Sequence, residues 1–466
     1  MDPSPVLDIV KNTFTEAKSS KFTNGKNRSV QITHSVFPLI KEAGGKAHAV
    51  ISIDPVRQEP LPCRKWPICR IPLHVREDNE KAYAPRLVSI GPLHHKRPGL
   101  EFMQAQKLRL FDSLLERGRH HGIYVLNVLS DAMKELEAET RECYAEDLTH
   151  IDSDSFTKMM LVDGCFVIEL LRLGGKSYQG KLADDPIFAT RWMPSNLGLD
   201  LLLIENQLPL FVLQRLFDLT RLGDEKDSLN KLALQFFESL RPGKDAITSE
   251  TTDHADRKYT HLLALFHASF APTETYCSNT QARRSCTYNT YSGKGWIYSA
   301  KSLSLCGLTF KKKSGNMLDL EFEDGVLKIS QLFIDDNTGI VLRNLMAHEQ
   351  GDRGSAPYFT SLVVFLGNLL CSRDDARVLM KAGIIRQPEN DEEEVVNFFN
   401  SLVKQLVFDM DRCYLHELIE DVNISSQSVW AKLRLRCRPI LPHLRIIEIA
   451  LFTVSLAQTF FLIRSS

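Results

Sequence analysis

The chain has 466 residues, of which 43% are hydrophobic and 25% are charged, a composition typical of a soluble globular protein with a large core. Its 57 Lys and Arg residues balance 58 Asp and Glu residues. This balance leaves no overall positive field to attract nucleic acid, so no nucleic-acid partner is expected.

The ten cysteines are spread singly, without the paired spacing of a zinc site or the density of a disulfide scaffold. This pattern predicts reduced thiols in a cytosolic protein, with no metal and no cofactor. The first residues, MDPSPVLDIVKNTFTEAKSSKF, lack the basic start and apolar segment of a secretory signal.

Residues 1–60 show no sustained periodicity and predict a poorly ordered N-terminal extension. Residues 61–440 predict a helical globular domain. One helical face is apolar at Met103, Leu110 and Leu114, which indicates an amphipathic helix. The stretch FTKMMLVDGCFVIELLRLGG, which contains Asp163 and Gly164, predicts a buried helix that ends at glycine.

The stretch SIGPLHHKRPG follows residue 88 and contains the group of side chains most suggestive of chemistry. Gly91 and Pro92 predict a turn, and His94 and His95 could act as acid, base or metal ligand. A zinc site would need further ligands, and adjacent histidines point apart on extended backbone. The simpler interpretation is a histidine that forms hydrogen bonds within a loop.

The apolar run LGLDLLLIENQLPLFVLQRLF carries Glu205, Asn206 and Gln207 in succession. Pro209 disfavours helix at the preceding residue, so one helix is expected to end near Gln207 and a second to begin at the proline. Buried polar side chains at such a junction would bond the unpaired backbone groups. The alternative, that Glu205 is a catalytic carboxylate, lacks a second acid at a fixed near spacing.

Residues 273–296 are rich in Ser, Thr, Asn and Gly and predict a loop or linker between possible lobes at 61–272 and 297–440. The stretch LDLEFEDGVLKIS alternates around Asp324 and Gly325 and predicts a β-hairpin. Helices are expected at 373–383 and 395–406. The stretch RNLMAHEQ, residues 343–350, predicts a helix terminus packed on the core.

The C-terminal stretch IIEIALFTVSLAQTFFLI, residues 446–463, would extend about 27 Å as a helix, close to the thickness of the hydrocarbon layer. Basic residues crowd its N-terminal side, while Arg464 alone follows it. The sequence therefore predicts a single-pass transmembrane helix at 446–463, with the bulk of the chain in the cytosol. The alternative is a buried terminal helix.

In order along the chain, VSIGPLHH, MMLVDGCFVIELL, DLLLIENQLPLFVLQRLF, RNLMAHEQ and an apolar end containing AQT resemble the plant-specific domain of unknown function 247 family. The resemblance implies a largely helical land-plant protein that often ends in a transmembrane helix and has no established enzymatic activity. Some grass members are associated with self-incompatibility loci, which implies recognition or signalling. The motif residues are Gly91, Pro92, His94, His95, Asp163, Gly164, Glu205, Asn206, Gln207, Pro209, Arg343, Asn344, Glu349 and Gln350.

The expected fold class is mainly α: a large helical body with a small β-hairpin and a C-terminal transmembrane helix. The leading function is a membrane-anchored interaction or recognition protein with an unknown protein partner. A second hypothesis is a hydrolase or transferase with His94 or His95 as base and Glu205 as acid or orienting group. A third is a secreted or lumenal recognition domain, because Asn27 and Asn423 begin glycosylation sequons.

Overall fold

The computed structural model describes residues 67–427 except 78, 121–124, 175–184, 222–224, 244–256, 273–295, 353, 405 and 410–411. These residues fall in one compact unit. The predicted extension at 1–60 and most of the predicted linker at 273–296 lie outside the described residues. The division into lobes at 61–272 and 297–440 stays a prediction.

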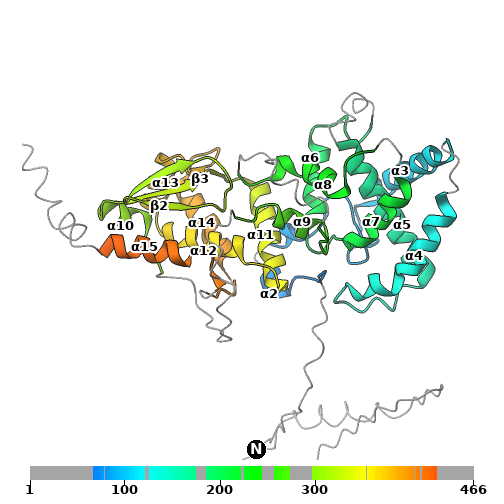
Figure 1. Cartoon of the computed structure of the whole chain (residues 1–466), viewed down its shortest axis with the longest axis horizontal. Helices are drawn as coiled ribbons and strands as arrows, with labels where there is room; N and C mark the ends of the chain where they lie inside the picture. The colour runs from blue at the N-terminus through cyan, green and yellow to red at the C-terminus, as the bar shows by residue number, and fades with distance from the viewer. Residues whose placement is uncertain are drawn as a thin grey trace, which may run out of the picture. The chain divides into compact units, whose positions relative to one another are not determined.

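Helices dominate the described residues, and two small sheets complete the fold (Figure 1). The first half contains α2 (Leu73–Arg76), η1 (Glu80–Ala82), α3 (Glu101–His120), α4 (Val125–Glu142), α5 (Ser153–Gly174), α6 (Trp192–Leu201), α7 (Leu210–Thr220), α8 (Leu229–Phe236), η4 (Glu238–Leu240) and α9 (Leu262–Ala268). The second half contains α10 (Ala300–Leu305), β1 (Thr309–Lys313), β2 (Glu321–Glu323), β3 (Val326–Ser330), β4 (Leu332–Phe333), α11 (Asp336–Gly351), α12 (Tyr358–Leu369), α13 (Arg373–Lys381), β5 (Ile385–Arg386), α14 (Glu392–Val403) and α15 (His416–Gln427).

Helix α5 is the buried helix that the sequence predicts, and it contacts α3, α4, α7 and α8. Two glycines allow this close packing. A Cβ atom at Gly164 would lie 2.4 Å from Leu216 Cδ1 of α7, and one at Gly174 would lie 2.4 Å from Phe236 Cδ2 of α8. Real Cβ atoms do not approach so closely, so a larger residue at either position would force the facing Leu216 or Phe236 side chain to move.

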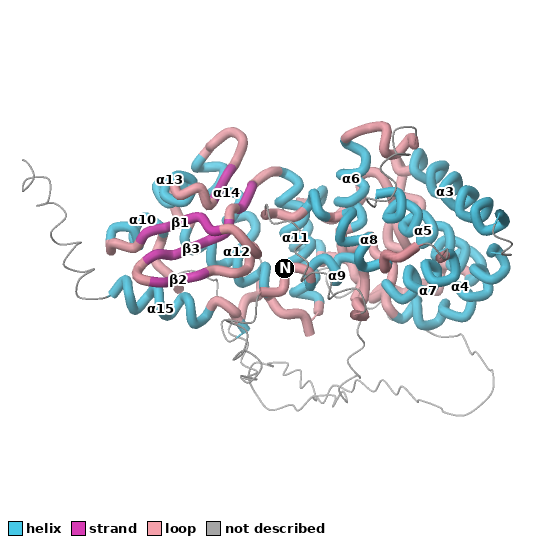
Figure 2. Tube along the Cα trace, turned by 45° about the horizontal axis from the view of Figure 1, so that its top comes forward, coloured by secondary structure: helices cyan, strands magenta, loops and turns pink. Residues whose placement is uncertain are grey.

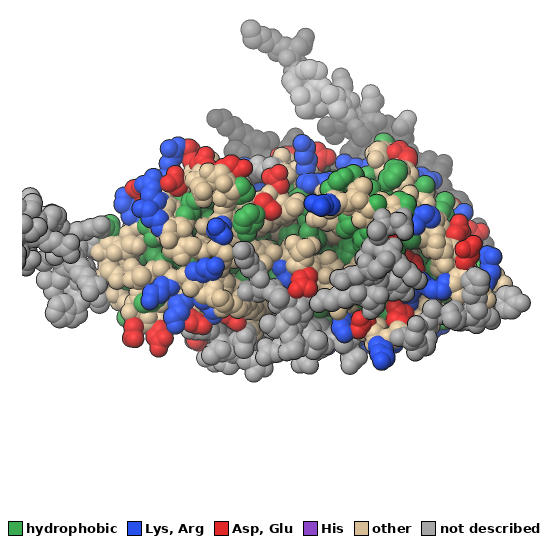
Figure 3. Space-filling model, turned by 90° about the horizontal axis from the view of Figure 1, so that it is seen from above, with side chains coloured by type: hydrophobic (Ala, Val, Ile, Leu, Met, Phe, Trp, Pro, Cys, Tyr) green, Lys and Arg blue, Asp and Glu red, His purple; other side chains and the backbone are tan. Residues whose placement is uncertain are grey.

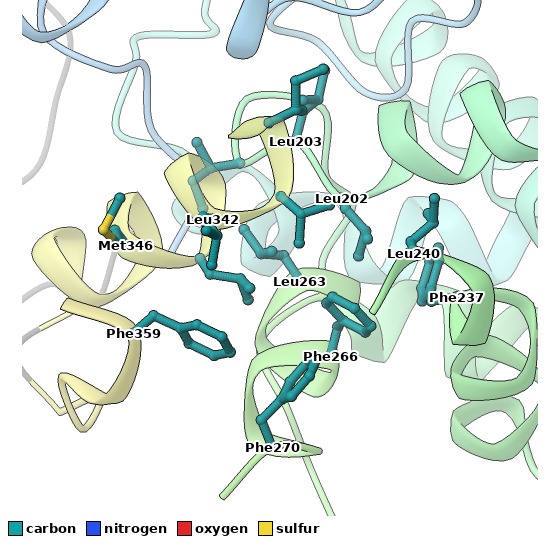
Figure 4. Close-up of a cluster of buried hydrophobic side chains, with 14 of the residues drawn as sticks. Leu202, Leu203, Phe237, Leu240, Leu263, Phe266, Phe270, Leu342, Met346 and Phe359 are labelled. Carbon is teal, nitrogen blue, oxygen red and sulfur yellow. The ribbon is translucent and has the colours of Figure 1, made fainter. Parts of the chain in front are cut away.

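A continuous apolar core runs from the α6–α9 region to α11 and α12. Figure 4 shows leucine, methionine and phenylalanine side chains from these elements gathered in one cluster. The rings of Phe266 and Phe270 meet edge to face at 5.0 Å, and Phe270 meets Phe359 at 5.1 Å. Burying each such side chain contributes roughly 1.5–3 kcal/mol, so this cluster joins α9 to α12 strongly.

The predicted hairpin is confirmed. Strands β2 and β3 pair antiparallel, with Phe322 opposite Leu327, and Asp324 and Gly325 both adopt positive φ in the turn. Strand β1 was not predicted; it pairs parallel with β3 and makes β3 the central strand (Figure 2). Its run of lysines lowered the apparent strand signal, yet lysines are common on edge strands because they discourage pairing with other chains.

The helices expected around 103–115 and 156–174 are present as α3 and α5, and those expected at 373–383 and 395–406 are present as α13, which ends at Lys381, and α14, which runs from Glu392 to Val403. The expected helix end near Gln207 is wrong, because α6 already ends at Leu201. Side chains of Asn206 and Gln207 bond the last carbonyls of α6, which stabilises an irregular segment where the apolar pattern alone favoured more helix. Helix α7 begins directly after Pro209, as predicted.

The expected fold class included a transmembrane helix, and the structure does not support that part of the expectation. None of the helices in the described part of the chain is long and apolar enough to cross a bilayer. Helix α12 is strongly apolar but has 12 residues, and the 22-residue α5 carries charged side chains at Asp163, Glu169 and Arg172. The predicted span at 446–463 lies outside the described residues. The supported fold class is mainly helical with small sheets.

Candidate functional site

The segment from residue 67 to residue 93 contains little regular structure, apart from one turn of helix in α2 and one in η1. We call it the anchored segment. Many of its residues are buried, including Ile71, Val88 and Ile90. Because buried backbone N–H and C=O groups need hydrogen-bond partners, a buried segment without helix or sheet must obtain them from side chains. The predicted motif residues supply many of these partners.

Glu205 holds the start of the anchored segment. Its carboxylate has 0% exposure. The Ile71 N–H donates to its Oε1 atom at 2.8 Å, and the Arg76 guanidinium donates to the same atom. His94 Nε2 lies 3.1 Å from its Oε2 atom, and Arg70 Nη1 lies 3.7 Å away.

Burial alone would raise the pKa of Glu205, but the neighbouring His94 and the hydrogen bonds from Arg76 and the Ile71 N–H outweigh it and lower the pKa below its ordinary value. Glu205 is therefore a buried, ionised acceptor that joins the first residues of the segment to His94.

Asp200 and Asn206 hold the later part of the anchored segment. The Asp200 carboxylate accepts the N–H groups of Leu87 at 2.7 Å, Val88 at 2.9 Å and Arg86 at 3.0 Å. Asn206 accepts the Ile90 N–H at 2.7 Å and donates to the Val88 carbonyl at 3.0 Å. Burial raises the pKa of Asp200 to about 6, although these N–H donors act against the shift. The two side chains fix the backbone at residues 86, 87, 88 and 90.

Gln207 lies on the other side of the same junction. Its amide nitrogen donates to the carbonyls of Leu201 at 2.7 Å and Leu203 at 2.8 Å, and its oxygen accepts the Leu263 N–H at the start of α9. Pro209 follows as the N-cap of α7. The prediction that these polar side chains bond backbone groups at the helix junction is confirmed for Gln207 and for the Asn206 bond to the Asp200 carbonyl, whereas Glu205 bonds the Ile71 N–H of the anchored segment instead.

Asp163 of α5 holds the turn at Gly91. It accepts the Gly91 N–H at 2.9 Å and pairs with the buried ammonium group of Lys107 at 2.5 Å. Gly91 has a φ of +72°, and a Cβ atom there would lie 3.0 Å from the Gln207 carbonyl and 3.1 Å from Tyr144 Oη. Both the backbone conformation and the close approach therefore require glycine. Pro92, which follows, is buried.

Two motif residues at the middle of α11 connect it to other parts of the chain. Asn344 accepts the Ile204 N–H at 3.0 Å and donates to the Ala82 carbonyl at 2.8 Å, so it joins α11 both to the polar junction and to the anchored segment. Arg343 donates to the Ser401 hydroxyl of α14 at 2.8 Å. These contacts bring together residues that are distant in the sequence.

The end of α11 carries Glu349 and Gln350, which organise the start of α12. Glu349 accepts the N–H groups of Phe359 and Thr360, each at 2.7 Å, where a negative charge favours a helix N-terminus. His267 Nε2 lies 2.7 Å from the same carboxylate. Gln350 exchanges two hydrogen bonds with the backbone of Val407. The predicted helix terminus packed on the core is confirmed.

Three buried histidines meet beside Glu349. The ring of His348 lies 5.1 Å from that of His261 and 5.3 Å from that of His267, measured between centroids. Burial, followed by the charge of His267, lowers the pKa of His348 to about 4. Burial also lowers the pKa of His261 well below its ordinary value. Within the described ranges, no group of acidic, histidine or cysteine side chains has a geometry that could hold a metal ion.

The hydrolase hypothesis required a histidine and Glu205 to lie within hydrogen-bond reach of each other in one concave pocket. The structure satisfies only the requirement on distance. His94 and Glu205 are in contact, whereas His95 is exposed. Both His94 and Glu205 are buried, at 5% and 0% exposure. A hollow among the described residues is lined by Arg241, Gly243, Phe270 and Met317, and neither His94 nor Glu205 lines it.

Comparison with known proteins identifies the family. The family model described as a plant protein of unknown function, domain of unknown function 247, matches residues 68–459. The chain belongs to the domain of unknown function 247 family. The resemblance seen in the sequence motifs is confirmed, and the match extends over the whole anchored segment and its partners.

Two curated relatives of this domain of unknown function 247 protein come from Arabidopsis thaliana. UPF0481 protein At3g47200 is 32% identical over 375 residues, which cover 76% of each chain. Putative UPF0481 protein At3g02645 is 21% identical over 442 residues, which cover 76% of this chain and 81% of the relative. No solved structure matches the chain.

Sequence reasoning missed Asp200, Lys107 and Arg76, which hold the anchored segment in this family member. Lys107 falls on the same face of α3 as Met103, Leu110 and Leu114, and a lysine in an apolar face is a signal of a buried partner. Asp200 likewise interrupts an apolar run five residues before Glu205. Arg76 carried no such signal, because it begins the charged run Arg76-Glu77-Asp78.

Proposed function

We propose that this plant protein is an interaction module, in which a helical scaffold holds an irregular segment and the surface turn after it in one conformation for a protein partner. One observation carries the proposal. Asp163, Asp200, Glu205, Asn206 and Asn344 are buried, and each bonds the backbone of the anchored segment.

Burying these polar and charged side chains costs free energy, which indicates that the conformation they fix has a function. Bonds to charged groups are worth about 1.5–3 kcal/mol each, but burying a carboxylate without such bonds costs more. A helix or strand would satisfy the same backbone groups without any buried acid. Loops held on a rigid scaffold are the usual location of binding residues. The anchored segment leads directly into such a loop, His95 to Gly99, whose residues are mostly exposed.

The proposal is tested by recovering the full chain from plant tissue after mild cross-linking and then reconstituting each candidate complex from purified proteins. Light scattering should give the mass of a complex with defined stoichiometry. The proposal fails if no recovered protein forms such a complex with the purified chain.

The hydrolase or transferase alternative has one observation in its favour, the 3.1 Å contact between His94 and Glu205. Assaying ester and amide substrates with wild type and the His94→Gln variant decides it. Turnover that is lost in His94→Gln would replace the interaction proposal with an enzymatic one.

The secreted alternative depended on two sequons. Asn27 lies outside the described residues. Asn423 lies within α15, and its amide nitrogen donates to the Trp296 carbonyl at 2.7 Å. A glycan would occupy that same nitrogen, so the described geometry gives this alternative no support.

A further inference from the structure

The turn that follows the anchored segment presents a small basic surface. We define the basic surface as Arg70, His95, Lys96 and Arg97. Lys96 and His95 are exposed, Arg97 is half-buried, and the Arg70 side chain is 46% exposed. The Arg70 guanidinium donates to the Leu93 carbonyl, which places it beside the turn.

Two charges of this surface have no ion-pair partner among the described residues. In the described part of the chain, neither Lys96 nor Arg97 takes part in an ion pair. Arg70 lies 3.7 Å from the buried Glu205, which already binds Arg76. Some exposed cations elsewhere do pair with acids, for example Lys301 with Asp374.

The backbone of the turn is fixed in a conformation that costs energy. Lys96 has a φ of +59°, and the other non-glycine residues with positive φ among those that the structure describes are Asp324 and Asn390, types that adopt this conformation readily. A lysine there costs about 1 kcal/mol, and its exposed side chain gains no internal contact in return. The N–H groups of His95 and Arg97 bond carbonyls three residues earlier, and Asp163 holds Gly91.

We propose that the basic surface is the docking site of this module and that it binds a short acidic segment of a protein partner. The inference rests on the proposed interaction function and assigns it a location and a chemistry. Guanidinium and ammonium groups recognise carboxylates through charge-assisted hydrogen bonds. A turn held in advance lowers the entropic cost of binding.

A protein segment fits better than a nucleic acid or a dense polyanion. Figure 3 shows Lys and Arg interspersed with Asp and Glu on the face it displays, without an extended basic area. Near the basic surface, Glu101 accepts the Gly99 N–H, and Glu146 accepts the Arg70 N–H. These acids border the surface and would repel a long run of phosphates, whereas a few carboxylates fit between them.

The test measures binding of a fluorescent hexaglutamate peptide to the full chain by anisotropy at low salt, with hexaglutamine and hexauridylate as comparison probes. The double variant Lys96→Glu with Arg97→Glu should weaken hexaglutamate binding about tenfold or more. The matched control, Lys311→Glu with Lys381→Glu, makes the same change of charge at exposed residues of β1 and α13 and should change binding less than about twofold.

Equal loss in both double variants, or no hexaglutamate binding by wild type, overturns the inference. So does tighter binding of hexauridylate, which would assign the surface to nucleic acid. Circular dichroism checks that each variant folds, and Lys96→Gln with Arg97→Gln replaces the charge reversals if one does not. If a reconstituted partner binds the Lys96→Glu, Arg97→Glu variant as well as wild type, the location is wrong while the interaction function stands.

Discussion

Replacing Glu205 with glutamine tests whether a buried ionised carboxylate holds the anchored segment. The change keeps the size of the side chain but removes its charge. Arg76 would remain 16% exposed and His94 4% exposed, with no carboxylate to bind. Removing one partner of a buried ion pair typically costs about 3–5 kcal/mol, because the remaining charge is uncompensated. The free energy of unfolding should therefore fall by about that amount, a large fraction of the usual total.

Urea unfolding of the full-length wild type and variant measures this difference. Glu116→Gln is the matched control, because Glu116 is exposed on α3 and its loss should change stability by less than about 0.5 kcal/mol. A Glu205→Gln variant within about 0.5 kcal/mol of wild type would refute the reasoning, since it would mean that the carboxylate does not hold the segment.

The pH dependence provides a second check. Burial raises the pKa of Glu205, but its hydrogen bonds lower it overall. The folded protein therefore binds this proton less readily than the unfolded chain, and the stabilisation is lost as the pH falls from the ordinary glutamate range through the lowered pKa. Because the glutamine variant has no such group, its deficit should shrink on acidification. A deficit that grows in acid would contradict the assignment.

Further predictions concern backbone strain and buried histidine. In thermal or urea unfolding, Gly91→Ala should lower the free energy of unfolding by about 2 kcal/mol or more. Gly99 has a φ of +89° but no atom within 4 Å of a new Cβ, so Gly99→Ala should lower it by about 1 kcal/mol. Equal losses would show that the close approach at Gly91 has no effect. Lys96→Gly should be about 0.5–1 kcal/mol more stable than Lys96→Ala, and the reverse order would show that the turn is unstrained. Burial lowers the pKa of His348 from 6.5 to about 4, so the unfolded chain binds this proton more readily than the folded protein. As the pH falls across that range, the free energy of unfolding should decrease by up to about 3 kcal/mol. A His348→Phe variant whose stability changes equally with pH would exclude this histidine as the cause.

The sequence predicted elements whose signals are local. Helix α5 and the turn at Asp324 and Gly325 follow from periodicity and turn chemistry over adjacent residues, and both appear where expected. Strand β1 was missed because its partner β3 lies more than ten residues further on and its own residues are mostly lysines. Parallel pairing leaves no such short-range signal.

For the candidate site, residue identities were predictable but their partners were not. A polar trio inside an apolar run indicates buried hydrogen bonds, and Gln207 forms them with its own junction. Glu205 and Asn206, in contrast, bond backbone groups near Ile71 and Ile90. Backbone N–H groups are the same at every residue, so no sequence pattern could identify which of them a distant carboxylate binds.

The separation of these partners along the chain bears on synthesis. Ile71 is bonded by a residue 134 positions later, and the Ala82 carbonyl is bonded by Asn344, 262 positions later. At ordinary rates of translation, the ribosome needs on the order of tens of seconds to supply the second of these partners. During that interval the nascent segment has unmatched amides and exposed apolar side chains, so its assembly in the cell should depend on chaperones that bind early and release late.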